Sequence, residues 1–251
     1  MKKLTLATIS IVGISLLSTH TNAASFDCNK ASTWVEKTIC RSSELSKLDE
    51  ALAKKYRKDL NYAANDEDSD IYKNNVIIDQ KLWLNFQRNT CKDTKCLIRE
   101  YEEHIGEKTY SDWTDELSSS DLPDKNAFGE FSKNFQISVY NVDGKRKNTL
   151  QDATNTLSIN KVGNKPYLSI IDGIFVFNNA HTCEIETSKA RWSQNHWVIN
   201  ESQQDKTLEL RLYPASYQGK SQLLLRDMDN KYRELHCGMR GYFDGIVLER
   251  E

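Results

Sequence analysis

Residues 28–105 carry the most regular pattern of this chain: they begin with CNKASTWVEKTIC (28–40), continue with ELSKLDEALAKKYRKDL (44–60) and end with QKLWLNFQRNTCKDTKCLIREYEEHI (80–105). Apolar residues recur in this region at steps of three and four, which is the spacing of an amphipathic α-helix. Two cysteines stand at its head and two near its tail, so disulfides can fasten the helices together. The pattern therefore predicts a small disulfide-linked helical bundle and suggests a binding scaffold.

The periodicity predicts four helices, separated by turns. They cover residues 31–39, 43–60, 72–90 and 96–105, with a break rich in Asn and Asp at residues 61–70. Ser32 or Thr33 can cap the first helix, with Glu36 as the acid of a capping box. Ser43 can cap the second helix, and Gly106 can end the last one.

The first 23 residues have the composition of a secretory signal peptide. Lys2 and Lys3 precede an apolar run from Leu4 to Leu17, and the next residues lead to Ala23. We expect this segment (1–23) to be removed and the mature protein to be periplasmic or secreted. No later segment approaches the roughly 20 apolar residues of a membrane-spanning helix, so no membrane span is expected.

The charge balance bears on the kind of partner. The chain has 34 Lys and Arg against 36 Asp and Glu, and removal of Lys2 and Lys3 leaves 32 against 36, a formal charge of −4. A nucleic-acid-binding protein normally presents a basic face, and this composition gives no support for one. Mild acidity instead suits a cationic partner, through electrostatic steering.

After the helical region (24–106), the sequence changes twice. Residues 107–127 are acidic and polar, with three consecutive serines and a proline, and they are predicted to be a linker. From residue 128 to 251, short apolar stretches of period two alternate with turn sequences such as Asp143-Gly144, Gly163-Asn164 and Asp229-Asn230. This part is predicted to be an antiparallel β-sandwich or barrel, with strands at 135–139, 167–177, 197–199, 208–212, 223–225 and 232–237. The predicted class of the whole chain is α+β.

The cysteine count supports export and three disulfides, because an even number of cysteines in an oxidising compartment is typical of disulfide-bonded proteins. The six cysteines are Cys28, Cys40, Cys91, Cys96, Cys183 and Cys237. Cys183 is expected to pair with Cys237 within the β part. The other four allow three pairings, and an antiparallel helical module favours Cys40 with Cys91 and Cys28 with Cys96. No CxxC unit is present, so we predict neither a zinc site nor another metal site.

Motifs of the common enzyme classes are not found in the sequence. It contains no GxSxG, no HExxH, no phosphate loop and no dinucleotide fingerprint. Its four histidines after the signal peptide stand singly. We therefore predict a protein that is not an enzyme and that uses no cofactor.

The helical region resembles the LprI-type family of lysozyme inhibitors, long described only as a domain of unknown function. The matching positions are Ser25 to Cys28, Thr38 to Cys40, Glu44-Leu45, Leu48-Asp49, Leu52, Tyr56, Trp83, Gln87-Arg88, Cys91, Cys96-Leu97 and Tyr101. The resemblance covers about the first third of the mature chain. It implies an exported protein that binds and inhibits lysozyme and so protects peptidoglycan.

Four basic residues surround the pair Cys91 and Cys96 and are the candidate partner-binding residues: Arg88, Lys92, Lys95 and Arg99. Lysozyme cleaves with two carboxylates in a cleft, and cationic groups on a disulfide-held turn could oppose them. Two alternatives stay open for these residues: Arg88 can be a buried tether for an acidic residue such as Asp49, and all four can be solvated charges near a helix junction. At the level of function, the alternatives are an envelope accessory protein that binds another envelope protein and a peptidoglycan-acting enzyme.

Overall fold

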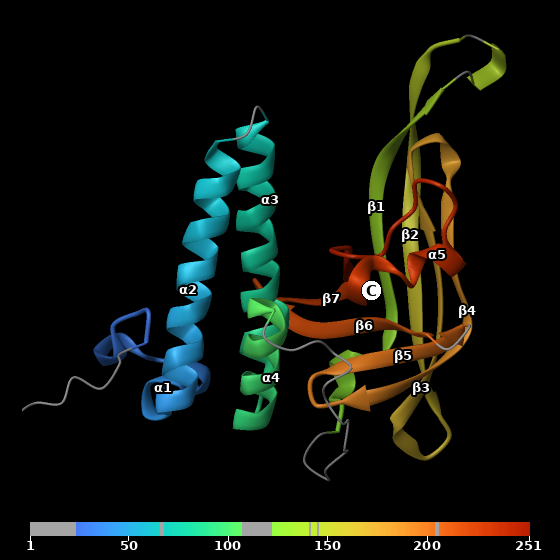
Figure 1. Cartoon of the computed structure of the whole chain (residues 1–251). Coiled ribbons are helices and arrows are strands. Elements are labelled where there is room, and N and C mark those ends of the chain that lie inside the picture. Colours follow the sequence, from blue (N-terminus) through green and yellow to red (C-terminus); the bar gives the residue numbers. More distant parts are fainter. Residues whose placement is uncertain (1–23, 66–67, 107–121, 141, 145, 204–205) are drawn as a thin grey trace, which may run out of the picture.

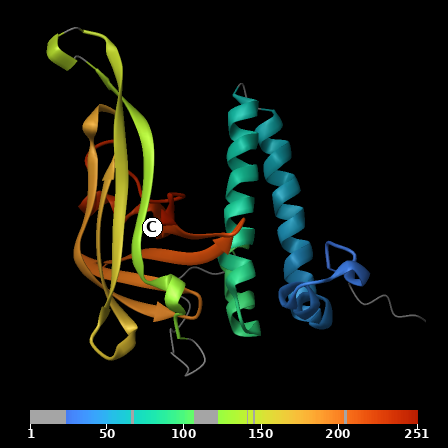
Figure 2. The same ribbon diagram turned by 180° about the vertical axis from the view of Figure 1, so that it is seen from behind.

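The computed structural model describes residues 24–65, 68–106, 122–140, 142–144, 146–203 and 206–251. It has an N-terminal helical region and a C-terminal antiparallel β-barrel, so the predicted α+β class is confirmed. The helices stand along one side of the barrel in both views (Figures 1 and 2). The predicted signal peptide (1–23) and most of the predicted linker (107–127) lie outside the described residues.

The helical region follows the predicted pattern with shifted boundaries. Its elements are η1 (Cys28–Lys30), α1 (Trp34–Arg41), α2 (Ser43–Ala64), α3 (Ser69–Leu82), the π-helical turn η2 (Trp83–Gln87), η3 (Arg88–Thr90) and α4 (Thr94–Ile105). The capping box is confirmed, because Thr33 Oγ1 accepts from Glu36 N at 3.1 Å and Glu36 Oε2 accepts from Thr33 N at 3.0 Å. Ser42, not Ser43, caps α2. Gly106 ends α4 in the left-handed region, as predicted, with φ 88°.

The helices share an apolar core, and the buried carboxylate of Asp49 lies beside it. Trp83 and Tyr101 are fully buried, and their ring centroids lie 5.0 Å apart. Asp49 of α2 accepts a hydrogen bond from Tyr101 Oη at 2.7 Å and from Ser25 N at 2.7 Å. Because a buried polar group needs such partners, Asp49 fixes α2 against both α4 and the segment before η1.

The disulfide pairing predicted for the helical region is wrong. Cys28 pairs with Cys40 and Cys91 pairs with Cys96. The prediction assumed that the head of the region meets its tail, but each bridge instead closes a local turn, 12 and 5 residues long in sequence separation. The apolar core, rather than a cross-link, holds the helices together. In the β part, the Cys183–Cys237 bridge is confirmed.

The β part is a closed barrel, not a sandwich. Its strands are β1 (Gly129–Tyr140), β2 (Asn148–Val162), β3 (Lys165–Val176), β4 (Thr182–Ser193), β5 (His196–Gln203), β6 (Lys206–Tyr217), β7 (Lys220–Asp227) and β8 (Val247–Arg250). Each strand pairs antiparallel with the next, and β1 closes the barrel against β8 through Phe131 opposite Arg250. The β1–β2 hairpin extends beyond the other strands (Figure 1). Closure leaves most strands without a free edge.

The middle parts of strands β5 to β7 are buried on both faces. Inward side chains belong to the barrel core, among them Trp197, Ile199, Leu210, Leu212, Leu223 and Leu225. On the outer face, Phe86 of the helical region packs with Tyr213, Ala215 and Leu224. The helical region and the barrel therefore share a packed interface on this side.

One predicted strand is wrong. Residues 232–237 form the short helix α5 (Arg233–His236), which follows the 3₁₀ turn η8 (Met228–Asn230). The carboxylate of Asp227 accepts from the backbone N–H groups of Tyr232 at 2.8 Å and Arg233 at 2.9 Å. Because these bonds satisfy the first amides of a helical turn, the segment forms a helix and not the predicted strand.

In the part of the chain that the structure describes, no helix is long and apolar enough to cross a membrane.

Gly241 packs directly against the Cys183–Cys237 bridge. A β-carbon at this position would lie 2.9 Å from Cys237 Cβ and closer still to Cys183 Sγ. We expect Gly241→Ala to lower the free energy of unfolding by about 1–3 kcal/mol, the usual cost of forcing a methyl group into a packed site. Urea denaturation under non-reducing conditions measures it.

The matched control is Gly238→Ala in the same segment. A β-carbon at Gly238 would find its nearest neighbour at 3.6 Å, an ordinary contact. This variant should therefore unfold at nearly the wild-type urea concentration. Equal destabilisation by the two substitutions would show that crowding at the disulfide is not the cause.

Candidate functional site

A disulfide-closed turn joins η3 to α4. Cys91 and Cys96 are bridged, with their Cα atoms 5.5 Å apart, and Asp93 Oδ1 accepts from Cys96 N at 2.8 Å to cap α4. Lys92 and Lys95, two of the candidate partner-binding residues, are exposed. The cross-link and the cap limit the movement of the backbone between them, so the turn presents two ammonium groups from a constrained loop.

The structure places the other two candidates differently. Arg99 is only 2 % exposed, so the prediction that it meets a partner at the surface is wrong. Arg88 is half-buried; its guanidinium lies 5.8 Å from the ring centroid of Trp83, and its Nε donates to Asn89 Oδ1 at 3.0 Å. Lys92 and Lys95 are thus the two exposed members of the predicted set.

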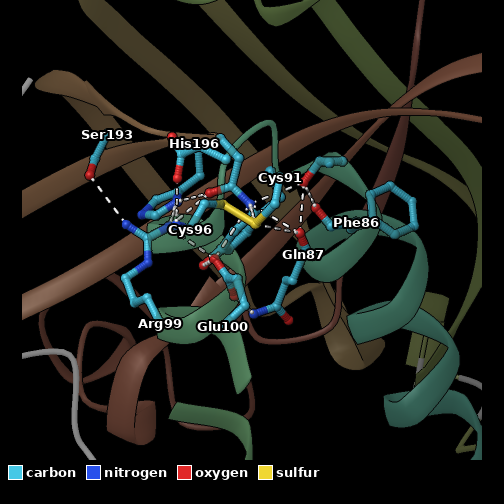
Figure 3. Close-up of a disulfide and its surroundings, with 12 residues drawn as sticks. Phe86, Gln87, Cys91, Cys96, Arg99, Glu100, Ser193 and His196 are labelled. Carbon is cyan, nitrogen blue, oxygen red and sulfur yellow. Dashed lines mark hydrogen bonds and ion pairs between the residues drawn. A yellow bond between two sulfur atoms is a disulfide. The ribbon is translucent and has the colours of Figure 1, made fainter. Parts of the chain in front are cut away.

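Arg99 links the helical region to the barrel. From α4 it reaches the β4–β5 turn, where Nη2 donates to Asn195 Oδ1 at 2.8 Å and Nη1 donates to Ser193 Oγ at 3.5 Å (Figure 3). Nη2 also forms an ion pair with the fully buried Glu100 at 3.0 Å. Burial lowers the pKa of Arg99, but Glu100, Tyr213 and Glu103 together outweigh that effect, and the pKa is raised overall. Arg99 is therefore a charged, paired residue of the interface.

The amide of Asn195 completes this contact. Its Nδ2 donates to the carbonyl oxygen of Gln87 at 3.1 Å and to Thr90 Oγ1 at 3.0 Å, while its Oδ1 accepts from Arg99. One side chain of the β4–β5 turn therefore binds η2, η3 and α4 at once. It holds the barrel directly behind the disulfide-closed turn.

A second buried ion cluster centres on Arg211, which points outward from β6. Arg211 Nη1 lies 2.6 Å from Glu103 Oε2 and Nη2 lies 3.2 Å from Glu103 Oε1, while Nε contacts Glu209. The side chains of Arg211, Glu103 and Glu209 are all less than a tenth exposed. Burial lowers the pKa of Arg211, but Tyr213 and the two carboxylates raise it well above its ordinary value. The cluster binds α4 to β6.

Two histidines lie near these clusters, one fully buried and one half-buried. His196 is fully buried, and burial together with Arg99 and Arg211 lowers its pKa well below the ordinary value. His104 stacks on Trp83 with ring centroids 4.7 Å apart. Burial, helped by Arg226 and opposed by Asp79, lowers the pKa of His104 to about 4. Both rings are therefore neutral at pH 7.

The His104 pKa makes stability depend on pH in a defined direction. A histidine whose pKa falls from 6.5 to about 4 on folding binds its proton more readily in the unfolded chain. Its contribution is therefore complete above pH 6.5 and is lost as the pH falls toward 4, at up to about 1.4 kcal/mol per pH unit. We expect His104→Gln to unfold with a shallower pH dependence than wild type between these values.

This difference isolates His104, because His196 and the buried carboxylates titrate in both proteins. Urea midpoints measured between pH 4 and pH 6.5 give the pH dependence of stability for each protein. Parallel curves for the two proteins would mean that His104 is protonated as easily in the folded chain as in the unfolded one.

No three His, Cys, Asp or Glu side chains within the described ranges are arranged to hold a metal ion. The perturbed groups at the interface are paired with one another across it, and structural ion-pair networks shift pKa values just as catalytic sites do. These ion pairs join the helical region to the barrel. The ammonium groups of Lys92 and Lys95 stay at the surface.

The sequence did not predict that Glu209 and Arg211 are buried at the interface, for a physical reason. Glu209 and Arg211 alternate with leucines in β6, which is the pattern of a strand with one face in water. A signal that this face is covered was Tyr213, a large aromatic side chain on the same outward face.

Comparisons with protein-family models, with curated proteins and with solved structures find no match to this chain. The site is therefore defined by its own geometry.

Proposed function

We propose that this protein is an exported binding protein that inhibits lysozyme by covering its cleft and so protects peptidoglycan. The observation that carries the proposal is the exposure of Lys92 and Lys95 on a turn constrained by the Cys91–Cys96 bridge and the Asp93 cap. The resemblance of residues 25–101 to LprI-type inhibitors supports the same partner.

The chemistry of inhibition follows from the two carboxylates of lysozyme. One of them must be protonated to act as the general acid, and a cation close by favours its ionised form. An ammonium group in the cleft would therefore remove the catalytic proton, and the turn around it would exclude the substrate. Limited backbone freedom helps, because ordering a free loop on binding costs affinity.

The barrel contributes by holding the turn from behind. Asn195 binds η2, η3 and α4 just beside Cys91, so the helical region cannot shift without breaking buried hydrogen bonds. The α4 face that carries Arg99 is covered by this contact. A partner would thus approach the free side of the turn, where Lys92 and Lys95 lie.

The test is a cell-wall clearing assay with lysozyme and the purified mature protein. Slower clearing in proportion to the added protein supports inhibition. Unchanged clearing would reject lysozyme as the partner and leave an envelope protein as the alternative, whereas clearing without lysozyme would indicate a peptidoglycan-acting enzyme. Lysozyme incubated with heat-unfolded protein controls for nonspecific effects.

A further inference from the structure

A pocket of about 410 Å³ lies where the helical region meets the barrel. Its walls come from the η2–η3 segment, the β4–β5 turn, the end of β6 and the residues just before β1. The volume falls within the range of small-molecule sites, roughly 300–1,000 Å³. Both the helical region and the barrel line the pocket, so it exists only while they are packed together.

Side-chain amides dominate the polar lining of this pocket. They belong to Asn85 and Asn89 of the η2–η3 segment, to Asn126 before β1, and to Gln194 and Asn195 of the β4–β5 turn. An amide carries both donors and acceptors, and a sugar hydroxyl likewise both donates and accepts. Converging amides therefore match a ligand with many hydroxyl groups better than they match an ion.

The apolar part of the lining includes two aromatic residues beside Pro214 and Ala215. Trp192 and Tyr217 both border the pocket. Tyr217 is half-buried, so its ring can offer apolar surface to the carbon-bound hydrogens of a sugar ring, whereas the ring of Trp192 packs on Trp197 in the barrel core. Trp192 is 3 % exposed, and within the described residues its Nε1 has no hydrogen-bond partner. Gln194 Oε1 is likewise buried from solvent and has no hydrogen-bond partner within the described residues. One wall thus holds an unsatisfied donor and an unsatisfied acceptor, the pair that a hydroxyl group can satisfy.

Formal charges around the pocket balance. Its lining contains one lysine, Lys92, and one carboxylate, Asp124, and both side chains are exposed. A site for an anion or a cation would concentrate one sign of charge, as helix termini and arginine forks do for phosphate. The balance favours an uncharged ligand.

We propose that this pocket binds a neutral, hydroxyl-rich ligand of the class of short oligosaccharides. The amides bind the hydroxyl groups, the ring of Tyr217 contacts the apolar face of a sugar, and the ligand spans both parts of the molecule. This proposal does not depend on lysozyme binding, because it rests on the pocket lining and can be tested without lysozyme. Lys92 borders both the pocket and the exposed side of the disulfide-closed turn.

The experiment is saturation-transfer NMR on the mature protein with three uncharged probes: triacetylchitotriose, maltotriose and cellotriose. We expect transfer to at least one of them. Removing two amides, Asn89→Ala with Asn126→Ala, should weaken its binding about tenfold, because two hydrogen bonds of ordinary strength are lost.

The matched control removes two exposed amides outside the pocket, Asn74→Ala with Asn200→Ala, and should bind as wild type. Thermal unfolding of both variants checks that the fold is intact. The proposal is overturned if none of the probes receives saturation, or if a probe binds equally to the wild type and to the Asn89/Asn126 variant.

Discussion

Replacing Arg211 with alanine is expected to lower the free energy of unfolding by about 3–5 kcal/mol, the usual cost of removing one partner from a buried ion pair. Glu103 and Glu209 would then remain buried beside each other without their cation. Part of this cost belongs to the interface, because Glu103 lies on α4 and Arg211 lies on β6. Denaturant unfolding followed by tryptophan fluorescence measures it.

An exposed ion pair in the same barrel serves as the control. Lys220 and Glu249 pair at 2.8 Å, but their side chains are 61 % and 50 % exposed. Lys220→Ala should therefore cost less than about 1 kcal/mol. If Arg211→Ala were no more costly than Lys220→Ala, the Arg211 cluster would not be a significant link between helices and barrel.

A combined variant separates the loss of the cation from the loss of packing. Changing Glu103 and Glu209 to leucine together with Arg211→Met removes all three charges and keeps most of the volume. We expect this variant to recover much of the stability lost in Arg211→Ala, because the desolvation cost of the charges disappears with them.

The second large effect is expected on inhibition. Changing both Lys92 and Lys95 to alanine should weaken inhibition of lysozyme about thirtyfold or more, since a binding hot spot loses about 2 kcal/mol or more when truncated. Both side chains are exposed, so the substitutions should leave stability nearly unchanged. Inhibition constants from clearing rates, determined at low and high salt, measure the effect.

Two exposed lysines of α2 provide the matched control. Lys54 and Lys58 stand one helical turn apart and lie away from the disulfide-closed turn. Their double alanine variant removes the same charge and should inhibit as wild type. If the Lys92/Lys95 variant inhibited lysozyme as strongly as wild type and with the same salt dependence, the turn would not be the contact surface. The barrel would then be the next candidate for that surface.

Local patterns of the sequence were sufficient for much of the fold. The three- and four-residue periodicity predicted α1, α2, α3 and α4, and the capping box at Thr33 and Glu36 marked the start of α1 within the sequence alone. Period-two stretches predicted five of the strands, among them β3, β6 and β7. These features depend on neighbours a few residues away, which a sequence displays directly.

Features that depend on distant contacts were not predictable in the same way. The pairing of Cys28 with Cys40 follows from how η1 folds back on α1, and the burial of Arg99 follows from the position of Asn195, 96 residues later in the chain. The long strand β2 was missed because its polar residues outnumber its apolar ones. Of the candidate site, Lys92 and Lys95 were named from the sequence and are exposed, but the interface between the helices and the barrel was not predicted.

The central claim, that the protein occludes the lysozyme cleft, is tested most directly by titrating lysozyme with the mature protein at concentrations far above the dissociation constant. We predict that residual activity falls linearly and reaches zero at one molecule of inhibitor per lysozyme, with the Lys92/Lys95 variant failing to reach this end point. Full lysozyme activity in the presence of a large molar excess of the folded, correctly disulfide-bonded protein would contradict the claim.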